Sequence, residues 1–174
     1  MALRILGFWL TLYTSIGWAA STDEAGIPLG VGDTVLITVY NEPDLTVSTK
    51  IGQNGRVKFP LIGERVVIGK QPEQLASELE AAYFDGYLVS PSVSVDVKSY
   101  RPIYIRGAVK SPGAYGFELG MTVDQAIALA GGLKDRASNS EWKLFRGDNP
   151  APTTVKKDSA VLPGDIIEIR ESLF

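Results

Sequence analysis

Side chains that could do covalent chemistry are scarce in this chain, because it contains no cysteine and no histidine. Without cysteine there is no disulfide, thiol nucleophile or thiolate metal site. Without histidine, the usual general base near neutral pH and the commonest metal ligand are missing. Only carboxylates, lysines, tyrosines and hydroxyls remain. We therefore predict no catalytic residue, no metal site and no cofactor, and we expect that the protein is not an enzyme.

One tripeptide, Asn41-Glu42-Pro43, matches the acid/base segment of a large clan of glycosidases. Those enzymes are built on β/α barrels of about 250 residues and place a second carboxylate about 5 to 10 Å away. The present chain has 174 residues and two helical segments, which is too little for such a barrel. Glycan hydrolysis is therefore a minor alternative, and it would require that Glu42→Gln abolish a cleavage activity.

An aromatic and basic run near the middle of the chain could contact a sugar polymer. It comprises Tyr100, Arg101, Tyr104 and Arg106. Aromatic faces stack on apolar surfaces such as those of sugar rings, and guanidinium groups donate hydrogen bonds to acidic groups. Because Ile103 and Ile105 alternate with Tyr104, one face of this strand is predicted to be core. Polysaccharide contact is thus a hypothesis for the other face.

The composition is that of an ordinary folded protein, with 45% hydrophobic and 21% charged residues. The formal net charge of −3 provides no basic field for nucleic acid, so we expect no nucleic-acid partner. The length suits one sizeable domain or two small ones.

The N-terminal segment has the pattern of a secretory signal peptide. Arg4 is the only charged side chain before Asp23, and residues 5–18 are apolar or weakly polar. This stretch is shorter than the roughly 20 apolar residues that span a bilayer. Small residues at Gly17 and Ala19 predict cleavage after residue 19. The alternative is an uncleaved membrane anchor.

The first half of the mature chain is predicted to be strand-rich with one helix. Strand patterns cover residues 33–40, 47–51, 56–61, 65–68 and 92–98, and apolar residues at helical spacing cover 72–83. Asn54-Gly55 favours a hairpin turn, and Pro60 indicates a strand edge or bulge.

The second half repeats this composition of strands with one helix. Strands are predicted at residues 102–106, 114–118, 142–146 and 165–170. Thr122 and Gln125 form a capping-box pattern that starts the helix, and a pair of glycines follows it. A type II turn is predicted at 111–113. The fold class is therefore predicted to be α+β. A Gly-Asp pair precedes a predicted strand in each half of the chain, at residues 32–33 and at residues 164–165.

Several spaced segments together resemble a known family, the polysaccharide export family of the bacterial outer membrane. The segments are residues 29–45, 53–63 and 86–95. After residue 101, residues 105–115 and 122–133 resemble a soluble-ligand-binding β-grasp (SLBB) module. The resemblance implies an export domain over residues 26–100 and an SLBB domain over 101–171.

The motif residues of this resemblance are mostly glycines and prolines, for which we predict structural roles in turns and caps. They are Gly32, Asp33, Pro43, Gly55, Pro60, Gly63, Pro91, Gly107, Pro112, Gly113, Gly131 and Gly132.

The resemblance implies a component of an export machine for capsule, exopolysaccharide or biofilm polysaccharide, located in the periplasm in association with the outer membrane. It implies a homo-oligomeric ring, an octamer by analogy with larger members, that conducts the polymer. The implied partners are the polysaccharide, an inner-membrane co-polymerase with a tyrosine kinase, and a separate outer-membrane channel of β-barrel type.

Three features depart from the larger members of the family. The chain has no cysteine for lipidation, one β-grasp match, and no amphipathic helix before Phe174. We therefore expect a short, unlipidated member that depends on a separate channel. The alternative function is a monomeric periplasmic carbohydrate-binding module.

Overall fold

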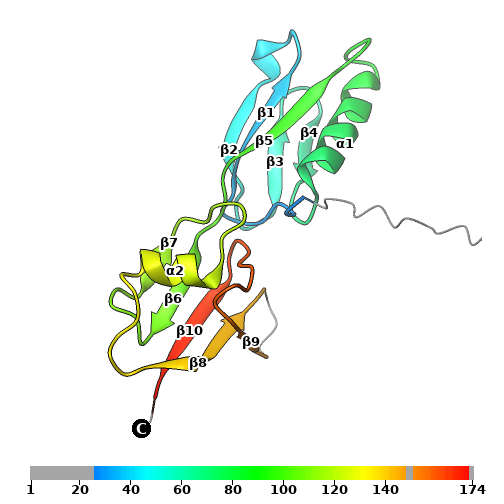
Figure 1. Cartoon of the computed structure of the whole chain (residues 1–174). Helices are drawn as coiled ribbons and strands as arrows, with labels where there is room; N and C mark the ends of the chain where they lie inside the picture. Colours follow the sequence, from blue (N-terminus) through cyan, green and yellow to red (C-terminus); the bar gives the residue numbers. More distant parts are fainter. Residues whose placement is uncertain (1–25, 148–150, 173–174) are drawn as a thin grey trace, which may run out of the picture.

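The computed structural model describes residues 26–147 and 151–172, so the predicted signal peptide, residues 1–19, lies outside the described residues. The elements run β1 (Thr34–Val39), η1 (Pro43–Leu45), β2 (Val47–Lys50), β3 (Arg56–Phe59), β4 (Gly63–Val66), α1 (Pro72–Phe84), β5 (Val93–Ser99), β6 (Ile103–Gly107), β7 (Gly113–Tyr115), α2 (Val123–Leu129), β8 (Ala137–Phe145), β9 (Thr153–Val155) and β10 (Ile166–Glu171). They form two modules placed end to end: an N-terminal module with β1 to β5 and α1, and a C-terminal module with β6 to β10 and α2 (Figure 1). Within the described ranges, no helix is long and apolar enough to cross a membrane.

The N-terminal module is built around β1. This strand lies between β2 and β5 and pairs antiparallel with both. Every second residue of β1 is buried, as the alternating sequence predicts. Helix α1 packs on this sheet through Leu75, Leu79 and Tyr83, which are buried in the same core cluster as the β1 side chains.

Helix α1 confirms the prediction over residues 72–83 and extends it by one residue. Pro72 occupies the first turn, where its missing N–H costs no hydrogen bond. The Gln71 N–H donates to Gln74 Oε1 (3.2 Å) and thereby satisfies a backbone donor at the helix start. Gly86 follows the helix with φ +91°, a conformation that glycine adopts without a Cβ penalty.

The predicted hairpin turn at Asn54-Gly55 is wrong, because β2 pairs with β1 and β3 pairs with β4. A hairpin turn of the Asn-Gly type needs positive φ at both central residues, whereas Gly55 (φ +65°) has it and Asn54 does not. The turn therefore leads the chain out of the first sheet. Pro60 lies in the turn of the β3–β4 hairpin and not within a strand, and Leu61 follows it with φ +66°.

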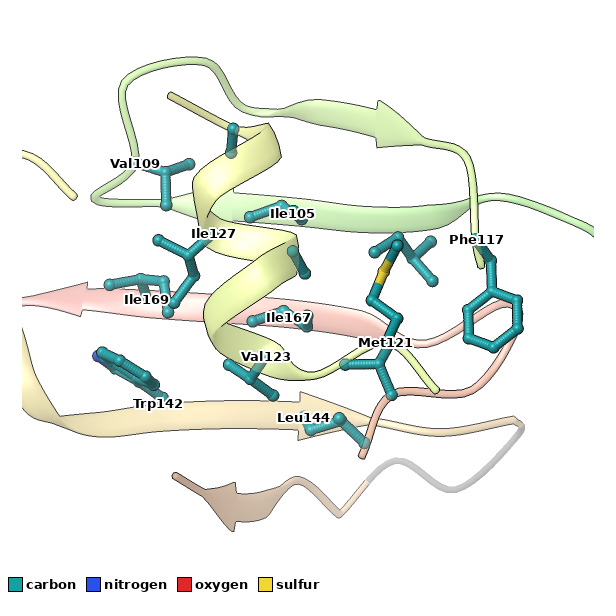
Figure 2. Close-up of a cluster of buried hydrophobic side chains, with 14 of the residues drawn as sticks. Ile105, Val109, Phe117, Met121, Val123, Ile127, Trp142, Leu144, Ile167 and Ile169 are labelled. Carbon is teal, nitrogen blue, oxygen red and sulfur yellow. The ribbon is translucent and has the colours of Figure 1, made fainter. Parts of the chain in front are cut away.

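The C-terminal module is a five-stranded mixed sheet in the order β7-β6-β10-β8-β9, with α2 on one face. Strands β6 and β10 are parallel neighbours at its centre. Figure 2 shows the helix side chains meeting the inward side chains of the sheet, with Trp142 beside Ile169 and Ile127. One helix in each of two strand-rich modules confirms the α+β fold class.

Helix α2 begins with the predicted capping box. The Thr122 N–H donates to Gln125 Oε1 (2.9 Å) and the Gln125 N–H donates to Thr122 Oγ1 (3.4 Å). The predicted type II turn is wrong, because Gly113 lacks the positive φ that such a turn requires. Strand β8 begins five residues before the predicted start, and β9 has no counterpart among the predicted strands.

Candidate functional site

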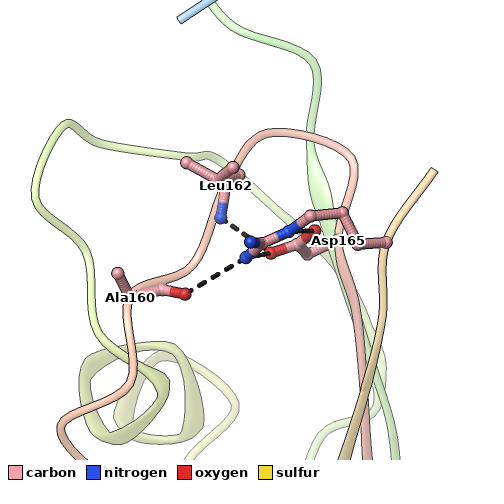
Figure 3. Close-up of polar contacts among 4 residues, drawn as sticks. Ala160, Leu162 and Asp165 are labelled. Carbon is pink, nitrogen blue, oxygen red and sulfur yellow. Dashed lines mark hydrogen bonds and ion pairs between the residues drawn. The ribbon is translucent and has the colours of Figure 1, made fainter. Parts of the chain in front are cut away.

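The repeated Gly-Asp signal in the sequence corresponds to one local structure that occurs twice. In the first copy, the Asp33 N–H donates to the Gly30 carbonyl (3.2 Å) and the Gly30 N–H donates to Asp33 Oδ2 (2.7 Å). In the second, the Asp165 N–H donates to the Leu162 carbonyl (3.1 Å) and the Leu162 N–H donates to Asp165 Oδ2 (2.7 Å; Figure 3). Each turn has a positive-φ glycine before the aspartate, as a type II turn requires.

Both turn aspartates are buried and both accept hydrogen bonds from an arginine. Asp33 is 0% exposed and Asp165 is 1% exposed. Arg146 donates two bonds to Asp165, from Nε to Oδ1 (2.9 Å) and from Nη2 to Oδ2 (2.8 Å). The bond to Asp165 raises the pKa of Arg146, although burial opposes this shift. Each buried carboxylate thus has the charged partner that its burial requires.

Arg101 joins the two modules at a point that we call the junction. Its backbone N–H donates to Asp33 Oδ1 (2.6 Å) and its Nη1 donates to Asp33 Oδ2 (2.9 Å). A Cβ atom at Gly30 would overlap the Arg101 guanidinium, and one at Gly164 would lie 3.0 Å from Arg101 Nε. The guanidinium therefore lies between the first turn, in the N-terminal module, and the second turn, in the C-terminal module.

Tyr100 also belongs to the junction. Its ring makes an edge-on contact with Phe117 (5.5 Å between ring centres, 89° between planes) at the core of the C-terminal module. Burial raises the pKa of Tyr100, with smaller contributions from Asp33 and Glu73 of the N-terminal module. The structure therefore places Tyr100 and Arg101 at the junction, apart from the other two residues of the aromatic and basic run.

Those two residues, Tyr104 and Arg106, lie on the face of the C-terminal sheet opposite α2, which we call the open face. Ile103 and Ile105 between them are buried, as predicted. Arg106 Nε donates to Glu168 Oε2 (2.9 Å), and the guanidinium carbon lies 5.0 Å from the centre of the Phe145 ring. This cation–π contact and the ion pair with Glu168 hold the guanidinium in place on the open face.

Strand register extends the open face across three strands. Tyr104 is the partner of Ile166, which is in turn the partner of Phe145. Directly paired residues point to the same side of a sheet, so two aromatic rings and an isoleucine form one row beside Arg106 and Glu168. A flat row of this kind can stack on sugar rings while the charged groups hydrogen-bond hydroxyls.

Phe145 and Glu168 are open-face residues that the sequence reasoning missed. The alternation of Glu168 with Ile167 and Ile169 could have indicated Glu168. No such alternation singles out Phe145, because Leu144 directly precedes it. Their pairing with Arg106 could not be inferred, because it depends on which strands are neighbours.

The motif glycines and prolines are distributed over turns and element ends. Gly107 is the most constrained: it has φ +92°, and a Cβ there would overlap the Ile169 carbonyl oxygen of β10. The others lie before β1 (Gly32, Asp33), in η1 (Pro43), before β3 (Gly55), around the β3–β4 turn (Pro60, Gly63), before β5 (Pro91), between β6 and β7 (Pro112), at the first residue of β7 (Gly113) and after α2 (Gly131, Gly132). These positions are compatible with roles in turns and caps. The structural roles of the motif residues remain a prediction.

No cluster of three or more acidic side chains suited to a metal ion occurs among the described residues. Glu42 of the glycosidase-like tripeptide is half-buried and directly precedes η1. The arrangements described above offer surfaces and ion pairs for binding and positioning.

Comparison with protein families matches residues 21–98 to a family described as "Polysaccharide biosynthesis/export protein" and residues 102–154 to the SLBB domain. The chain is also similar to the exopolysaccharide production protein ExoF of Rhizobium meliloti (strain 1021), with 34% identity over 93 residues. That alignment covers 52% of this chain and 22% of ExoF, so the matched part is about a fifth of that protein's length. Residues 21–98 therefore belong to the polysaccharide biosynthesis/export family, and an SLBB domain follows them in the same chain.

Proposed function

We propose that this protein is a non-enzymatic component of a polysaccharide export machine that assembles into an oligomeric ring and conducts the polymer. The observation that carries the proposal is the order of the two matched domains, export then SLBB. Both domain families comprise export or binding proteins, which supports a role in export without covalent chemistry. The similarity to ExoF, whose name refers to exopolysaccharide production, favours an exopolysaccharide as the cargo.

The proposed location is the periplasm, in association with the outer membrane, after removal of the predicted signal peptide. The proposed partners are an inner-membrane co-polymerase with its tyrosine kinase and a separate outer-membrane channel. A ring of identical subunits, eight by analogy with larger family members, would lie between them. Conduction requires that each contact with the polymer be weak enough to break as the polymer moves.

The open face of the SLBB domain suits such weak contact. Tyr104 and Arg106 are exposed on one face of the sheet, and Arg106 borders only a shallow, open hollow. A flat platform can stack on one sugar ring after another without trapping any of them. We therefore assign polymer contact to Tyr104 and Arg106, and we assign Tyr100 and Arg101 to the junction.

The mass of the mature protein in solution tests the assembly. Light scattering over a concentration series should give a closed assembly of fixed subunit number. A strict monomer at every concentration, together with stoichiometric binding of one oligosaccharide, would favour the alternative of a monomeric carbohydrate-binding module. Cleavage of a glycan that is lost in Glu42→Gln would instead indicate a hydrolase.

Affinity electrophoresis in gels that contain the exopolysaccharide tests the polymer contact. Replacing Tyr104 by Ala and Arg106 by Gln should abolish the retardation. The control is Lys156→Gln with Lys157→Gln, which changes two exposed charges outside the open face. Unchanged retardation of the Tyr104 and Arg106 variant would place the polymer contact elsewhere.

A further inference from the structure

The N-terminal module carries an exposed apolar patch at its end remote from the C-terminal module. It is formed by residues 40–46 after β1 and by residues 84–92, which run from the last residue of α1 to the start of β5 (Figure 1). Its exposed apolar side chains are Tyr40, Phe84, Tyr87 and Val89. Val89 is 92% exposed and Tyr40 is 73% exposed. We call this set the loop patch, and clusters of this kind mark interaction sites.

The loop patch is acidic as well as apolar. Its loops contain Glu42, Asp44 and Asp85 and no lysine or arginine. None of the three carboxylates is within ion-pair distance of a basic side chain in the described part of the chain. The patch therefore presents negative charge beside aromatic and aliphatic side chains, which disfavours an anionic lipid surface. Pairing of two loop patches would bring like charges together.

A second exposed patch has the opposite charge. The β3–β4 hairpin and the residues directly after it expose three apolar side chains, Leu61, Val66 and Ile68. Arg65 pairs with the buried Val57 and so lies on the other face of the hairpin. The face of Val66 carries the charged side chains Arg56, Lys58 and Glu64. Its two basic side chains outnumber the one carboxylate, and neither has an ion-pair partner among the described residues. We call these apolar and charged residues, without Arg65, the hairpin patch.

Two further features of the hairpin patch indicate a partner. Strand β4 pairs with β3 alone, so its outer edge is open within the described chain, and open edges invite pairing with another chain. Leu61 at the tip is exposed with φ +66°. This conformation strains the backbone of a bulky residue, and such strain concentrates at functional sites. The hairpin therefore holds an apolar side chain outward at an energetic cost.

From these observations we infer that the hairpin patch of one copy of this chain docks on the loop patch of a second copy. Both patches are exposed on the same molecule, their charges are opposite, and each has an apolar part to bury. Contact between two different patches of identical subunits is head-to-tail, and such contacts generate rings when the rotation closes. The inference rests on the proposed self-association and names the surfaces that mediate it.

The experiment disables each patch separately and then mixes the variants. The hairpin variant is Lys58→Glu with Val66→Ser, and the loop variant is Tyr40→Ser with Val89→Ser. Each should weaken association by on the order of 100-fold, because both lose apolar contact and the hairpin variant also brings like charges together. The loop variant keeps its carboxylates, so the two altered patches repel each other. Light scattering should find each variant monomeric where the wild type assembles, and circular dichroism should find both folded.

A mixture of the two variants gives the decisive result. A head-to-tail pair can use the intact loop patch of the hairpin variant and the intact hairpin patch of the loop variant. The mixture should therefore form a 1:1 dimer that grows no further. Leu119→Ser with Leu129→Ser is the matched control, since it removes two exposed leucines from the C-terminal module and should leave assembly unchanged.

The possible outcomes separate the inference from the function on which it rests. A wild-type protein that stays monomeric at all concentrations contradicts both self-association and this interface. A wild type that assembles together with variants that also assemble overturns the interface alone. Monomeric variants whose mixture yields no dimer show that the two patches do not meet each other.

Discussion

Replacing Arg101 by Met should destabilise the protein and uncouple its two modules. Methionine retains an apolar chain of similar reach but removes the guanidinium that lies between the two Gly-Asp turns. Asp33 is fully buried and would lose its charged partner, retaining the backbone N–H groups of Gly30 and residue 101 as donors. The change therefore leaves a buried carboxylate with two hydrogen bonds and no counter-charge.

The magnitude follows from this geometry. Removing one partner of a fully buried ion pair costs about 3–5 kcal/mol. The Arg101 side chain is 25% exposed, so water can enter the vacated space, and two donors remain. A hydrogen bond to a charged group contributes about 1.5–3 kcal/mol. We expect the free energy of unfolding to fall by about 2 kcal/mol.

Urea unfolding followed by two probes measures both effects. Trp142 fluorescence reports on the C-terminal module, because Trp142 is buried in its core and is the only tryptophan after residue 18. Far-ultraviolet circular dichroism reports mainly on α1, the longer helix, in the N-terminal module. The two transitions should coincide in the wild type and separate in Arg101→Met. The matched control is Arg146→Met, which removes a guanidinium from Asp165 within the C-terminal module.

The control should lower stability without separating the two transitions. A change of less than about 0.5 kcal/mol in the free energy of unfolding of Arg101→Met, the range of ordinary surface substitutions, would contradict this role of the guanidinium. Equal separation of the transitions in both variants would show that the junction has no special role.

Three further predictions concern single positions. Gly107→Ala should destabilise the C-terminal module by more than about 3 kcal/mol in thermal unfolding. The alanine Cβ would overlap the Ile169 carbonyl oxygen, and the positive φ adds backbone strain. Gly116→Ala is the control and should be neutral, because nothing lies near the Cβ position of Gly116. Thr122→Ala should cost about 1 kcal/mol in the same assay through loss of the α2 cap, and Thr122→Ser should restore most of it. Because burial raises the pKa of Tyr100 above 10.0, the stability that its neutral phenol contributes is present below pH 10 and is lost as the pH rises through the higher folded pKa. Absorbance at 295 nm should detect a late-titrating tyrosine that Tyr100→Phe removes, and an unchanged titration would contradict the assignment.

Elements governed by local pattern could be predicted from the sequence. The alternation in β1 and β6, the helical spacing of α1 and the capping box of α2 each act within a few residues, and the structure confirms them. The types of the turns at Asn54-Gly55 and Pro112-Gly113 could not be predicted from the sequence, because the same dipeptides occur in several turn types. Packing of the flanking strands decides among those types, and residues 52–55 join strands that do not pair with each other.

The candidate site was predictable only in part, because its geometry depends on contacts between distant residues. The aromatic and basic run suggested one surface, yet the structure divides it between the junction and the open face. The partner of Arg101 is Asp33, 68 residues earlier. That of Arg106 is Glu168, 62 residues later. A local pattern shows that a residue can bind a charge or an aromatic ring, but not which strand or turn supplies the partner.

The repeated turn explains what an ion pair adds to the apolar contact between Tyr100 and Phe117 at the junction. An apolar contact is non-directional, so two small modules joined by the short segment between β5 and β6 could pivot against each other. Asp33 instead binds both the backbone and the side chain of Arg101, and Gly164 leaves room for that side chain at the second turn. Fixed hydrogen-bond geometry favours one orientation even where the net contribution to stability is small. A ring built from head-to-tail contacts between N-terminal modules would need this property, since otherwise the open faces of the SLBB domains would not hold a common orientation toward the polymer.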